Sequence, residues 1–282
     1  MAEQTAAQTA AQAAARTAAQ TAAVQVRDLE VSYGWGRRAT RILHGITMDV
    51  TRGQTVGIVG ESGSGKSTLA KTLTGTIRPT TGTVRIAGLD VFGTRGADRT
   101  GMRRRVQMIP QDPYSSLNPR RTIGEALAEA VDPRHAKVKK HQEEIVHWLE
   151  TVRMPADTIH QYPHECSGGQ RQRIAIARGL ILRPEVVIAD EITSALDVSV
   201  QAEILNLIAG LRRELGLTMV FISHNLAVVR HVSDEVAVLY RGDIVERGAT
   251  ADLYERPRHA YTRALLDAVP GAARPGSGCT RA

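Results

Sequence analysis

The sequence predicts an α/β fold, with a mainly parallel β-sheet covered by helices. Short apolar runs at residues 55–60, 185–190 and 218–223 are typical of parallel strands that are buried on both faces. Between the last two runs, apolar residues recur at helical spacing from Val200 to Leu215. Strands that alternate with helices in this way favour a parallel sheet with helices on both of its faces.

The ordered part of the chain is expected to begin near residue 24. Residues 1–23 form a low-complexity tract of Ala, Gln and Thr without a large apolar face, which predicts a mobile tail, with a frayed helix as the alternative. The alternation in "VQVRDLEVSY" (24–33) then predicts a strand. At the other end, the Gly, Ala, Arg and Ser residues after Pro270 predict disorder.

Further elements are expected between these ends. The sequence predicts a helix over 66–75, a glycine-bounded strand over 82–88 and another strand over 235–240. The section from about 113 to 168 differs, because it holds no convincing buried strand. It is therefore predicted to be a helical insertion in the α/β core.

Composition and charge narrow the function classes only slightly. The formal net charge of +7 permits nucleic acid, an anionic membrane surface or phosphorylated ligands as partners. Cys166 and Cys279 lie far apart and suggest neither a disulfide framework nor a CxxC metal site. No run reaches the ~18 apolar residues of a membrane span, and the N-terminus lacks the pattern of a secretory signal. A cytosolic protein is expected, with any membrane contact made through a partner.

One segment has the pattern of a phosphate-binding loop. The stretch "GESGSGKS" (60–67) matches GxxxxGKS directly after a predicted strand and before a predicted helix. Its glycines allow successive backbone N–H groups to point at phosphate oxygens, and the helix N-terminus adds the positive end of its dipole. Lys66 can reach the β- and γ-phosphates, and the Ser67 hydroxyl can ligate Mg²⁺. The alternative, a glycine turn without a ligand, is disfavoured by the complete pattern in this context.

Two adjacent acids at the end of an apolar run supply the second part of such a site. Asp190 ends "VVIAD" and can hold Mg²⁺ directly or through water. Glu191 is a candidate general base for an attacking water. Two acids at a strand end can also begin a solvated loop, but the nearby GxxxxGKS motif favours the metal role for Asp190.

Three further segments carry polar residues whose roles spacing alone does not assign. Gln111 and His224 each follow a predicted strand, where a surface polar residue is the ordinary interpretation. The stretch "CSGGQ" (166–170) places a serine and two glycines before a helix-like run, so it has the pattern of a second phosphate-binding element. A simple helix N-cap is the alternative.

Together these segments resemble the ATP-binding subunits of ABC transporters. The resembling elements, in the family's order, are the loop at 60–67, Gln111, "CSGGQ" at 166–170, "VVIADE" with Asp190 and Glu191, "SALD" at 194–197, and His224. The resemblance covers about residues 24–260 and implies a P-loop NTPase core with a mainly parallel sheet, an antiparallel β subdomain and an inserted helical subdomain at about 113–168. Residues 261–282 then form a partly disordered C-terminal extension.

The resemblance also implies a head-to-tail dimer that holds two ATP molecules, with Mg²⁺, between its subunits. Each ATP would lie on the loop of one subunit and under the SGGQ segment of the other. The nucleotide contacts carried over are Tyr33, Gly60, Glu61, Ser62, Gly63, Ser64, Gly65, Lys66, Ser67, Thr68, Ser167, Gly168, Gly169, Gln170 and Asp197. The catalytic residues carried over are Glu191, His224 and Gln111, and the Mg²⁺ ligands are Ser67, Gln111 and Asp190.

This sequence departs from the family's usual pattern at two positions, and a third position has a neighbouring alternative. Cys166 replaces the usual apolar first residue of the signature, and Ile192 replaces the usual proline after the glutamate. Neither change removes a phosphate contact or the base, so ATP hydrolysis is still expected, with altered local packing. Tyr33 is expected to stack on adenine, although the neighbouring Trp35 is an alternative.

Longer stretches at 111–129, 191–208 and 258–270 resemble the ATPases of oligopeptide, dipeptide and nickel importers. Such an ATPase pairs with a homologous or identical ATPase beneath two transmembrane permease subunits, at the cytoplasmic face of the membrane. An extracytoplasmic solute-binding protein feeds the complex. Peptide import is the expected function, and import of nickel or another small solute is the alternative.

Two other function classes fit less well. An ABC ATPase that acts on nucleic acid is disfavoured because the chain has one cassette, no long heptad run and no CxxC pair, so no nucleic-acid partner is expected. A non-enzymatic regulator would be expected to lack Glu191 or Lys66, and both are present. His160 and His164 do not support nickel handling, because Pro163 breaks the helix that would align them.

Overall fold

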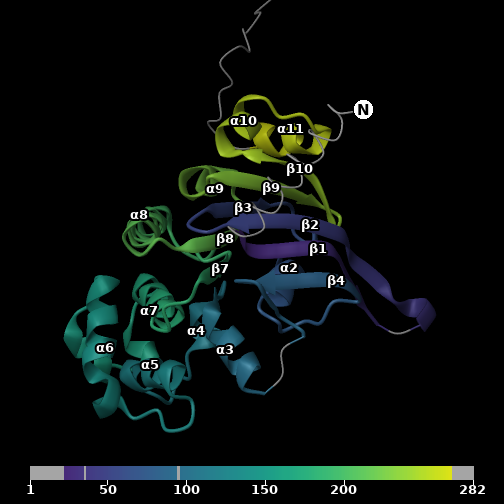
Figure 1. The fold of residues 1–282 in the computed structure, drawn as a ribbon. Helices are drawn as coiled ribbons and strands as arrows, with labels where there is room; N and C mark the ends of the chain where they lie inside the picture. Colours follow the sequence, from purple (N-terminus) through teal and green to yellow (C-terminus); the bar gives the residue numbers. More distant parts are fainter. Residues whose placement is uncertain (1–21, 35, 94–95, 269–282) are drawn as a thin grey trace, which may run out of the picture.

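The computed structural model describes residues 22–34, 36–93 and 96–268, which form two β-sheets with helices around them (Figure 1). The larger sheet has six strands, with parallel pairing from β9 through to β6 and β10 antiparallel to β9. This confirms the predicted mainly parallel sheet. In sheet order the strands are β10 (Asp243–Ala249), β9 (Glu235–Tyr240), β3 (Thr55–Val59), β8 (Thr218–Ser223), β7 (Val186–Asp190) and β6 (Val106–Ile109).

The smaller sheet has four antiparallel strands, in agreement with the implied antiparallel subdomain. Its order is β2 (Thr40–Thr51), β1 (Ala22–Tyr33), β4 (Thr81–Ile86) and β5 (Leu89–Asp90). Strand β1 begins two residues before the expected boundary, because Ala22 pairs with Thr51 and both Ala22 and Ala23 are buried. The rest of the expected tail and the C-terminal residues 269–282 lie outside the described residues.

Two other predicted boundaries are wrong by two residues, and in both cases residues with a left-handed backbone conformation end the element early. The strand expected over 82–88 ends at Ile86, because Ala87 and Gly88 adopt positive φ values of 50° and 81°. The helix expected over 66–75 ends at Leu73, and Gly75 follows with a φ of 72°. A left-handed backbone conformation ends both a strand and a helix.

The two faces of the parallel sheet are covered by different layers. Neighbouring side chains along a strand point to opposite faces. Val186 and Ile188 therefore pack with α2 and the antiparallel sheet, whereas Val187 and Ala189 pack with the helices from α5 onward. The helices are α2 (Lys66–Leu73), α3 (Ala97–Arg105), α4 (Pro113–Ser116), α5 (Ile123–Val131), α6 (Val138–Thr151), α7 (Gly168–Leu180), α8 (Val198–Leu215), α9 (Leu226–Val232), α10 (Thr250–Glu255) and α11 (Ala260–Asp267), with 3-10 turns η1 (Gly36–Arg38), η2 (Ala156–His160) and η3 (Pro163–Glu165).

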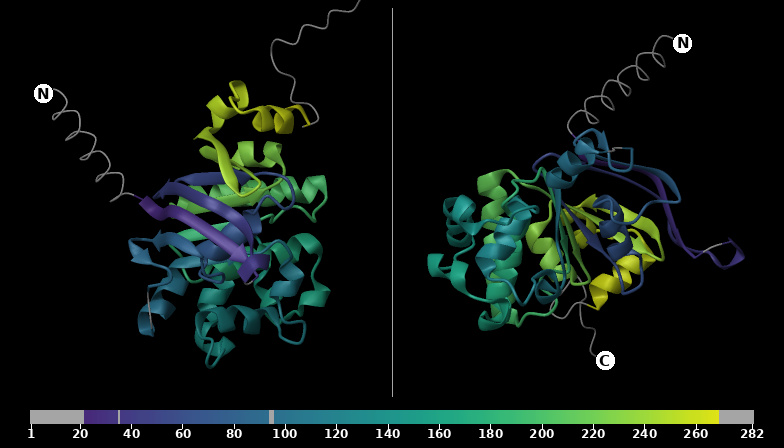
Figure 2. Two further views of the ribbon diagram at one scale, coloured as in Figure 1. Left: turned by 90° about the vertical axis from the view of Figure 1, so that its right-hand side faces the viewer. Right: turned by 90° about the horizontal axis from the view of Figure 1, so that it is seen from below.

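Between residues 113 and 168 the chain forms helices and turns, without a strand. Helix α5 begins at a capping box, in which the Thr122 hydroxyl accepts the Glu125 N–H and the Glu125 carboxylate accepts the Thr122 N–H. Apolar residues of α5, α6 and α7 share one core with the sheet. Figure 2 shows these helices (teal) and the antiparallel strands (purple) on opposite sides of the parallel sheet.

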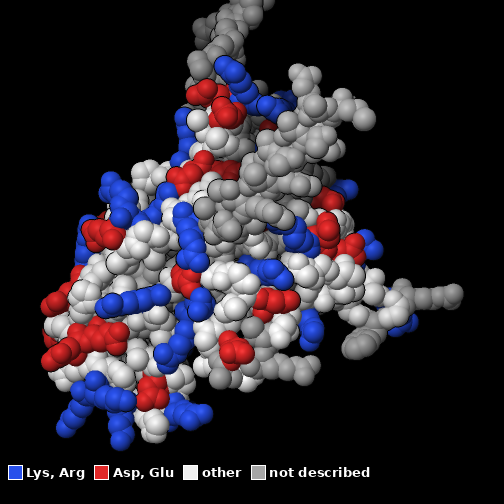
Figure 3. Space-filling model, in the orientation of Figure 1, with Lys and Arg blue, Asp and Glu red and all other residues white. Residues whose placement is uncertain are grey.

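Surface charge is mixed on the face shown in Figure 3. Lys and Arg side chains alternate there with Asp and Glu over the described residues, rather than forming one basic stripe. Among the described residues, no helix is both long and apolar enough to cross a membrane.

Candidate functional site

Residues predicted to bind nucleotide, hold Mg²⁺ or take part in catalysis gather at one edge of the parallel sheet. Gly60 follows β3, His224 follows β8, Asp190 ends β7, and Gln111 lies two residues after β6. These four strands are parallel neighbours, so their carboxyl ends meet at the same edge. Open α/β sheets bind ligands at such an edge.

The loop that follows β3 is built around glycines for steric reasons. A Cβ atom on Gly60 would lie 2.1 Å from the carbonyl oxygen of Leu239. Gly63 and Gly65 hold φ values of 81° and 107°, which side chains disfavour. The loop therefore runs directly into the first turn of α2, whose N–H groups have no partner within the helix.

The other predicted loop residues differ in exposure. Glu61, Ser62 and Gly63 are exposed, and Ser67 and Thr68 lie in the first turn of α2. Ser64 is buried, and its hydroxyl has no hydrogen-bond partner among the described residues. Its carbonyl accepts the Gly242 N–H at 3.0 Å, which ties the loop to the β9–β10 turn.

Lys66 is buried in the centre of the loop. Its ammonium donates to the carbonyl oxygens of Gly60 and Glu61 at 2.7 and 2.8 Å and lies 3.9 Å from Glu191 Oε1. Burial lowers the pKa of Lys66, while the neighbouring carboxylates, chiefly that of Glu191, act in the opposite direction. A buried cation with carbonyl partners is poised to exchange them for other oxygen ligands, such as those of a phosphate.

Asp190 and Ser67 supply oxygens suited to a magnesium ion. Asp190 is 4% exposed, and one carboxylate oxygen, Oδ1, has no hydrogen-bond partner among the described residues. Burial, followed by the charge of Glu191, raises the pKa of Asp190, while Lys66, Lys71 and the Ser67 hydroxyl act in the opposite direction. The described residues hold no group of three His, Cys, Asp or Glu side chains that could form an all-protein metal site. This arrangement fits Mg²⁺, which takes one or two carboxylates, phosphate oxygens and water.

Glu191 lies at the centre of the polar cluster. Its Oε2 accepts a hydrogen bond from Gln111 Nε2 at 3.3 Å and lies 3.3 Å from His224 Nδ1. The backbone adopts a φ of 48°, and the Glu191 N–H donates to the Ile222 carbonyl at 2.9 Å. The side chain is only 16% exposed, whereas that of His224 is 55% exposed. The structure thus brings Lys66, Gln111 and His224 around one carboxylate.

The SGGQ segment lies elsewhere, at the start of α7. Ser167 caps this helix by accepting the Gln170 N–H at 3.3 Å, and Gln170 Oε1 accepts the Ser167 N–H at 2.7 Å. Gly169 packs closely on α8, because a Cβ there would lie 2.7 Å from Val200 Cγ1. Ser167, Gly168 and Gln170 are exposed. The first turn of α7 is therefore open to another molecule.

Asp197 begins the neighbouring helix α8. Its carboxylate accepts the Val200 N–H at 2.9 Å and the Ser199 hydroxyl at 2.7 Å, and these hydrogen bonds hold the pKa of Asp197 below its ordinary value. The next residue, Val198, is 83% exposed. Exposed first turns of α7 and α8 thus lie together on one face, where Gly169 meets Val200.

Tyr33 and the SGGQ segment lie on different elements from the phosphate loop, and only the SGGQ segment belongs to the other face of the parallel sheet. Tyr33 ends β1 in the antiparallel sheet, pairs with Thr40 and is 46% exposed. Helices α2 and α7 belong to cores on opposite faces of the parallel sheet.

Comparison with known proteins decides the family. Residues 43–194 match the family described as ABC transporter, and residues 245–280 match the family described as oligopeptide/dipeptide transporter, C-terminal region. The chain belongs to the ABC transporter family. As an ABC ATPase it binds and hydrolyses ATP.

Several relatives of this ABC ATPase carry transport names. A putative peptide import ATP-binding protein of Brucella ovis is 48% identical over 248 residues, which cover 88% of this chain and 78% of the relative. The di/tripeptide transport ATP-binding protein DppF of Pseudomonas aeruginosa is 49% identical over 247 residues, 86% of this chain and 76% of the relative. The oligopeptide transport ATP-binding protein OppF of Escherichia coli is 46% identical over 235 residues, 83% of this chain and 70% of the relative.

Solved structures agree with the fold. The ATP-binding cassette MJ0796, seen as a dimer in a post-hydrolysis state with ADP and Pi, is 26% identical with a TM-score of 0.71, over 80% of this chain and 98% of that one. The cbiO1 protein of Clostridium perfringens has a TM-score of 0.74 at 24% identity, over 89% of this chain and 96% of that one. The P-loop NTPase α/β fold is confirmed.

The two departures from the family pattern both lie in the core of this ABC ATPase. Cys166 is 4% exposed, and its thiol donates to Gln161 Oε1 and the Tyr162 carbonyl at 3.6 and 3.7 Å. Burial raises the pKa of Cys166, which keeps the thiol protonated. Ile192 is 1% exposed in the same core. Cys166 is therefore packed in the core directly before the SGGQ segment.

Two residues at the site were not singled out from the sequence. Ser194 receives a hydrogen bond from Gln111 at 3.4 Å and donates to the Glu191 carbonyl at 2.9 Å. Tyr261 accepts the N–H of Glu61 at 2.9 Å. Ser194 could have been predicted to lie at the site, because it begins the "SALD" segment just after Glu191. No neighbouring sequence feature predicts that Tyr261 lies there.

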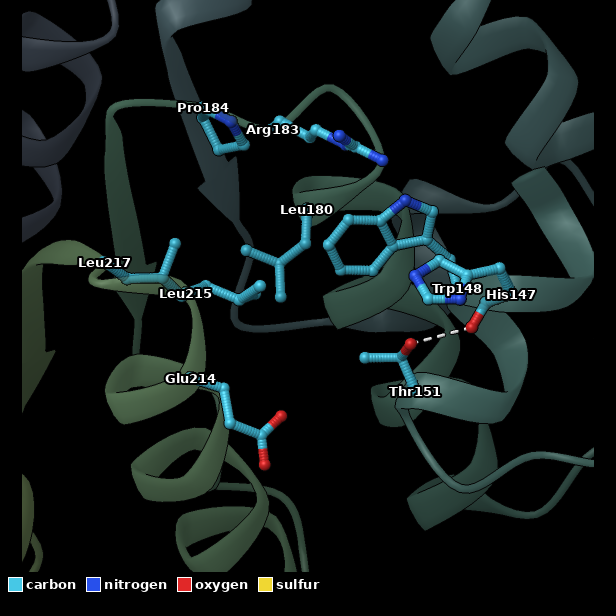
Figure 4. Close-up of a pocket in the computed structure, with 9 residues that line it drawn as sticks. All are labelled: His147, Trp148, Thr151, Leu180, Arg183, Pro184, Glu214, Leu215 and Leu217. Carbon is cyan, nitrogen blue, oxygen red and sulfur yellow. Dashed lines mark hydrogen bonds between the residues drawn. The ribbon is translucent and has the colours of Figure 1, made fainter.

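A separate cavity of about 410 Å³ lies between α6, α7 and α8 (Figure 4). Its lining includes Trp148 and His147, whose carbonyl accepts the Thr151 hydroxyl at 2.7 Å. Leu217, directly before β8, and Pro184, two residues before β7, also line it. The cavity is therefore at the amino edge of the sheet, opposite the site around Glu191.

Proposed function

We propose that this ABC ATPase powers the import of peptides across a membrane. The observation that supports this most strongly is the match of residues 245–280 to the C-terminal region of oligopeptide/dipeptide transporters, beside the ABC transporter match at 43–194. The three relatives named above carry peptide import, di/tripeptide transport and oligopeptide transport in their names. Each covers most of this chain.

The phosphate loop and α2 would bind the triphosphate of ATP. The backbone N–H groups of Gly63 and of residues 65–68, together with the ammonium of Lys66, offer donors for its oxygens. Asp190 and Ser67 would hold Mg²⁺, with Gln111 as a further ligand. When bound, Mg²⁺ offsets the negative charge of the phosphate oxygens. Tyr33 would stack on the adenine ring from the exposed end of β1.

Glu191 is placed to act as the general base. In the proposed reaction, water attacks the γ-phosphorus, Glu191 accepts the proton of that water, and ADP leaves. The contacts of Gln111 and His224 with Oε2 hold the carboxylate in one orientation. His224 and Lys66 also lie where they could stabilise charge on the transferred phosphoryl group. The short distances from Glu191 to Lys66, Gln111 and His224 support these roles.

The exposed first turn of α7 supports a dimeric site. Ser167, Gly168, Gly169 and Gln170 would contact the γ-phosphate bound to the loop of a second ATPase subunit, and Asp197 would lie across the same interface. A helix N-terminus with small residues is suited to this contact, because its N–H groups can approach an anion closely. The second subunit is a homologous or identical ATPase.

The proposed complex includes two transmembrane permease subunits, with the chain at the cytoplasmic face of the membrane. An extracytoplasmic solute-binding protein would deliver the peptide. ATP binding would close the dimer, and hydrolysis would reopen it. This cycle does work only if ATP binds the closed dimer more tightly than the open one.

Uptake by membrane vesicles tests the proposal. Vesicles that contain the permease subunits, the ATPase subunits and the binding protein should accumulate a labelled peptide only with MgATP on the side of this chain. The same vesicles with a Lys66→Ala chain are the control and should not accumulate it. Accumulation of Ni²⁺ without peptide accumulation would replace the peptide proposal by the nickel alternative.

A further inference from the structure

The C-terminal helix α11 makes a direct hydrogen bond to the phosphate loop. The hydroxyl oxygen of Tyr261 accepts the backbone N–H of Glu61 at 2.9 Å, across 200 residues of sequence. Tyr261 belongs to the region that matches oligopeptide/dipeptide transporters, whereas Glu61 is the second residue of the phosphate loop. The contact therefore joins the two parts of the chain that the family comparisons identify separately.

The tyrosine is held in place on three sides. Its ring lies 4.1 Å from the ring of Tyr240 at the end of β9, measured between centroids. The backbone N–H of Tyr261 donates to His259 Nδ1 at 3.2 Å, which caps α11. Glu246 of β10 accepts the N–H groups of Arg258 and His259 at 2.7 and 2.9 Å. The hydroxyl therefore reaches the loop from a fixed support.

Glu61 connects this support to the lysine of the loop. Its N–H is bound by Tyr261, and its carbonyl accepts the ammonium of Lys66 at 2.8 Å. A second tie from the same side of the fold is the bond from the Gly242 N–H to the Ser64 carbonyl. Two points of the loop are thus fixed by the C-terminal part of the chain.

We propose that Tyr261 is a positioning residue for ATP binding, and that through it helix α11 sets the affinity of the phosphate loop for a nucleoside triphosphate. Without the hydroxyl, the Glu61 N–H loses its protein partner and this part of the loop gains conformational freedom. Binding must then order the loop again, which costs affinity. The inference rests on the proposed role of the loop in binding ATP.

A Tyr261→Phe substitution in the full chain tests the proposal, because it removes only the hydroxyl. We expect the affinity for a fluorescent ATP analogue to fall by about threefold to tenfold, the range set by one neutral hydrogen bond. In ATP hydrolysis, KM should rise by a similar factor with kcat nearly unchanged. A role in fold stability alone would lower the melting temperature and leave both affinity and KM as they were.

Tyr254→Phe is the matched control. Tyr254 of α10 is in the same C-terminal region, is half-buried like Tyr261, and donates its hydroxyl to the Leu226 carbonyl away from the loop. We expect this variant to lose stability but keep its affinity for the analogue, measured well below both melting temperatures. Wild-type affinity in Tyr261→Phe, or equal loss in both variants, would overturn the proposal.

The Lys66→Ala variant distinguishes failure of the positioning role of Tyr261 from failure of the proposed ATP binding by the phosphate loop. If Lys66→Ala weakens binding of the analogue and Tyr261→Phe does not, the loop binds ATP but Tyr261 does not position it. If Lys66→Ala binds as the wild type does, the assignment of the loop fails and the positioning role fails with it. Neither result depends on peptide uptake, which tests the transport proposal alone.

Discussion

Glu191 holds a backbone conformation that residues with side chains seldom adopt. A positive φ in a residue other than glycine costs about 1–3 kcal/mol and persists only where the surroundings impose it. Here the Glu191 N–H bonds to Ile222, and Ile192 is buried directly after it. The strained residue also carries the carboxylate that Lys66 and His224 approach. Strain, packing and the proposed chemistry therefore coincide at one position.

A Glu191→Gln substitution should nearly abolish turnover and keep ATP bound. The amide cannot accept the proton of an attacking water, so kcat should fall about 10²- to 10⁴-fold, while Lys66 and the loop are unchanged. The measurements are ATP hydrolysis and retention of labelled ATP by the chain. Glu185→Gln is the control, because Glu185 pairs with Arg52 and Arg105 at the opposite end of β7. Turnover in Glu191→Gln equal to that of the control would remove the general-base assignment.

Helices α5 and α7 begin with the same local motif, but the first turn of α5 is buried and that of α7 is exposed to solvent. Both have a capping box, Thr122 with Glu125 and Ser167 with Gln170. The first turn of α5 is packed, since Ile123 and Gly124 are buried. The first turn of α7 is open, since Ser167 and Gly168 are exposed. An uncovered helix N-terminus with glycines is available to an anion from another molecule.

A Ser167→Arg substitution should abolish hydrolysis and leave ATP bound to the phosphate loop. The arginine side chain would fill the space that the proposed trans contact needs, whereas Lys66 lies on a different helix. Hydrolysis by the assembled complex and binding of an ATP analogue by the single chain are the two measurements.

Thr122→Arg controls for the loss of the capping box in this experiment. It should cost roughly 1 kcal/mol of stability, as the loss of an N-cap does, without abolishing hydrolysis. Full hydrolysis in Ser167→Arg would contradict the trans role of the SGGQ segment.

The whole molecule combines a phosphate loop at the edge of the parallel sheet with an exposed first turn of helix α7. The two elements belong to cores on opposite faces of the parallel sheet, so one chain does not bring them together. The phosphate loop is tied to β9, β10 and α11, which places most of its support in the last part of the chain. Nucleotide binding should therefore stabilise the fold as a whole.

MgATP should raise the melting temperature of the full chain. A ligand at 100 times its Kd stabilises the folded state by about 2.7 kcal/mol, which corresponds to a shift of roughly 5 °C or more. The shift should vanish in Lys66→Ala and persist in Ser167→Arg, as measured by calorimetry in saturating MgATP. A shift of equal size in Lys66→Ala would place the nucleotide elsewhere.

Local patterns in the sequence are sufficient to predict the core strands, the glycine loop and the polar residues at the strand ends. Apolar runs, glycines and GxxxxGKS depend on neighbours within a few residues, so β3, β7, β8 and β9 were placed correctly. The boundaries were less accurate, because Ala22 joins β1 through pairing with the distant Thr51 and Ala87 ends β4 through a left-handed turn.

Tertiary structure alone decided how these elements meet. The sequence determined that Glu191 follows a strand and that Ser167 caps a helix. It did not determine that Glu191 lies between Lys66, Gln111 and His224, or that Tyr261 reaches Glu61 across 200 residues. Such contacts depend on the packing of whole elements, because strands and helices far apart in the chain are brought together only by burial of their shared apolar faces.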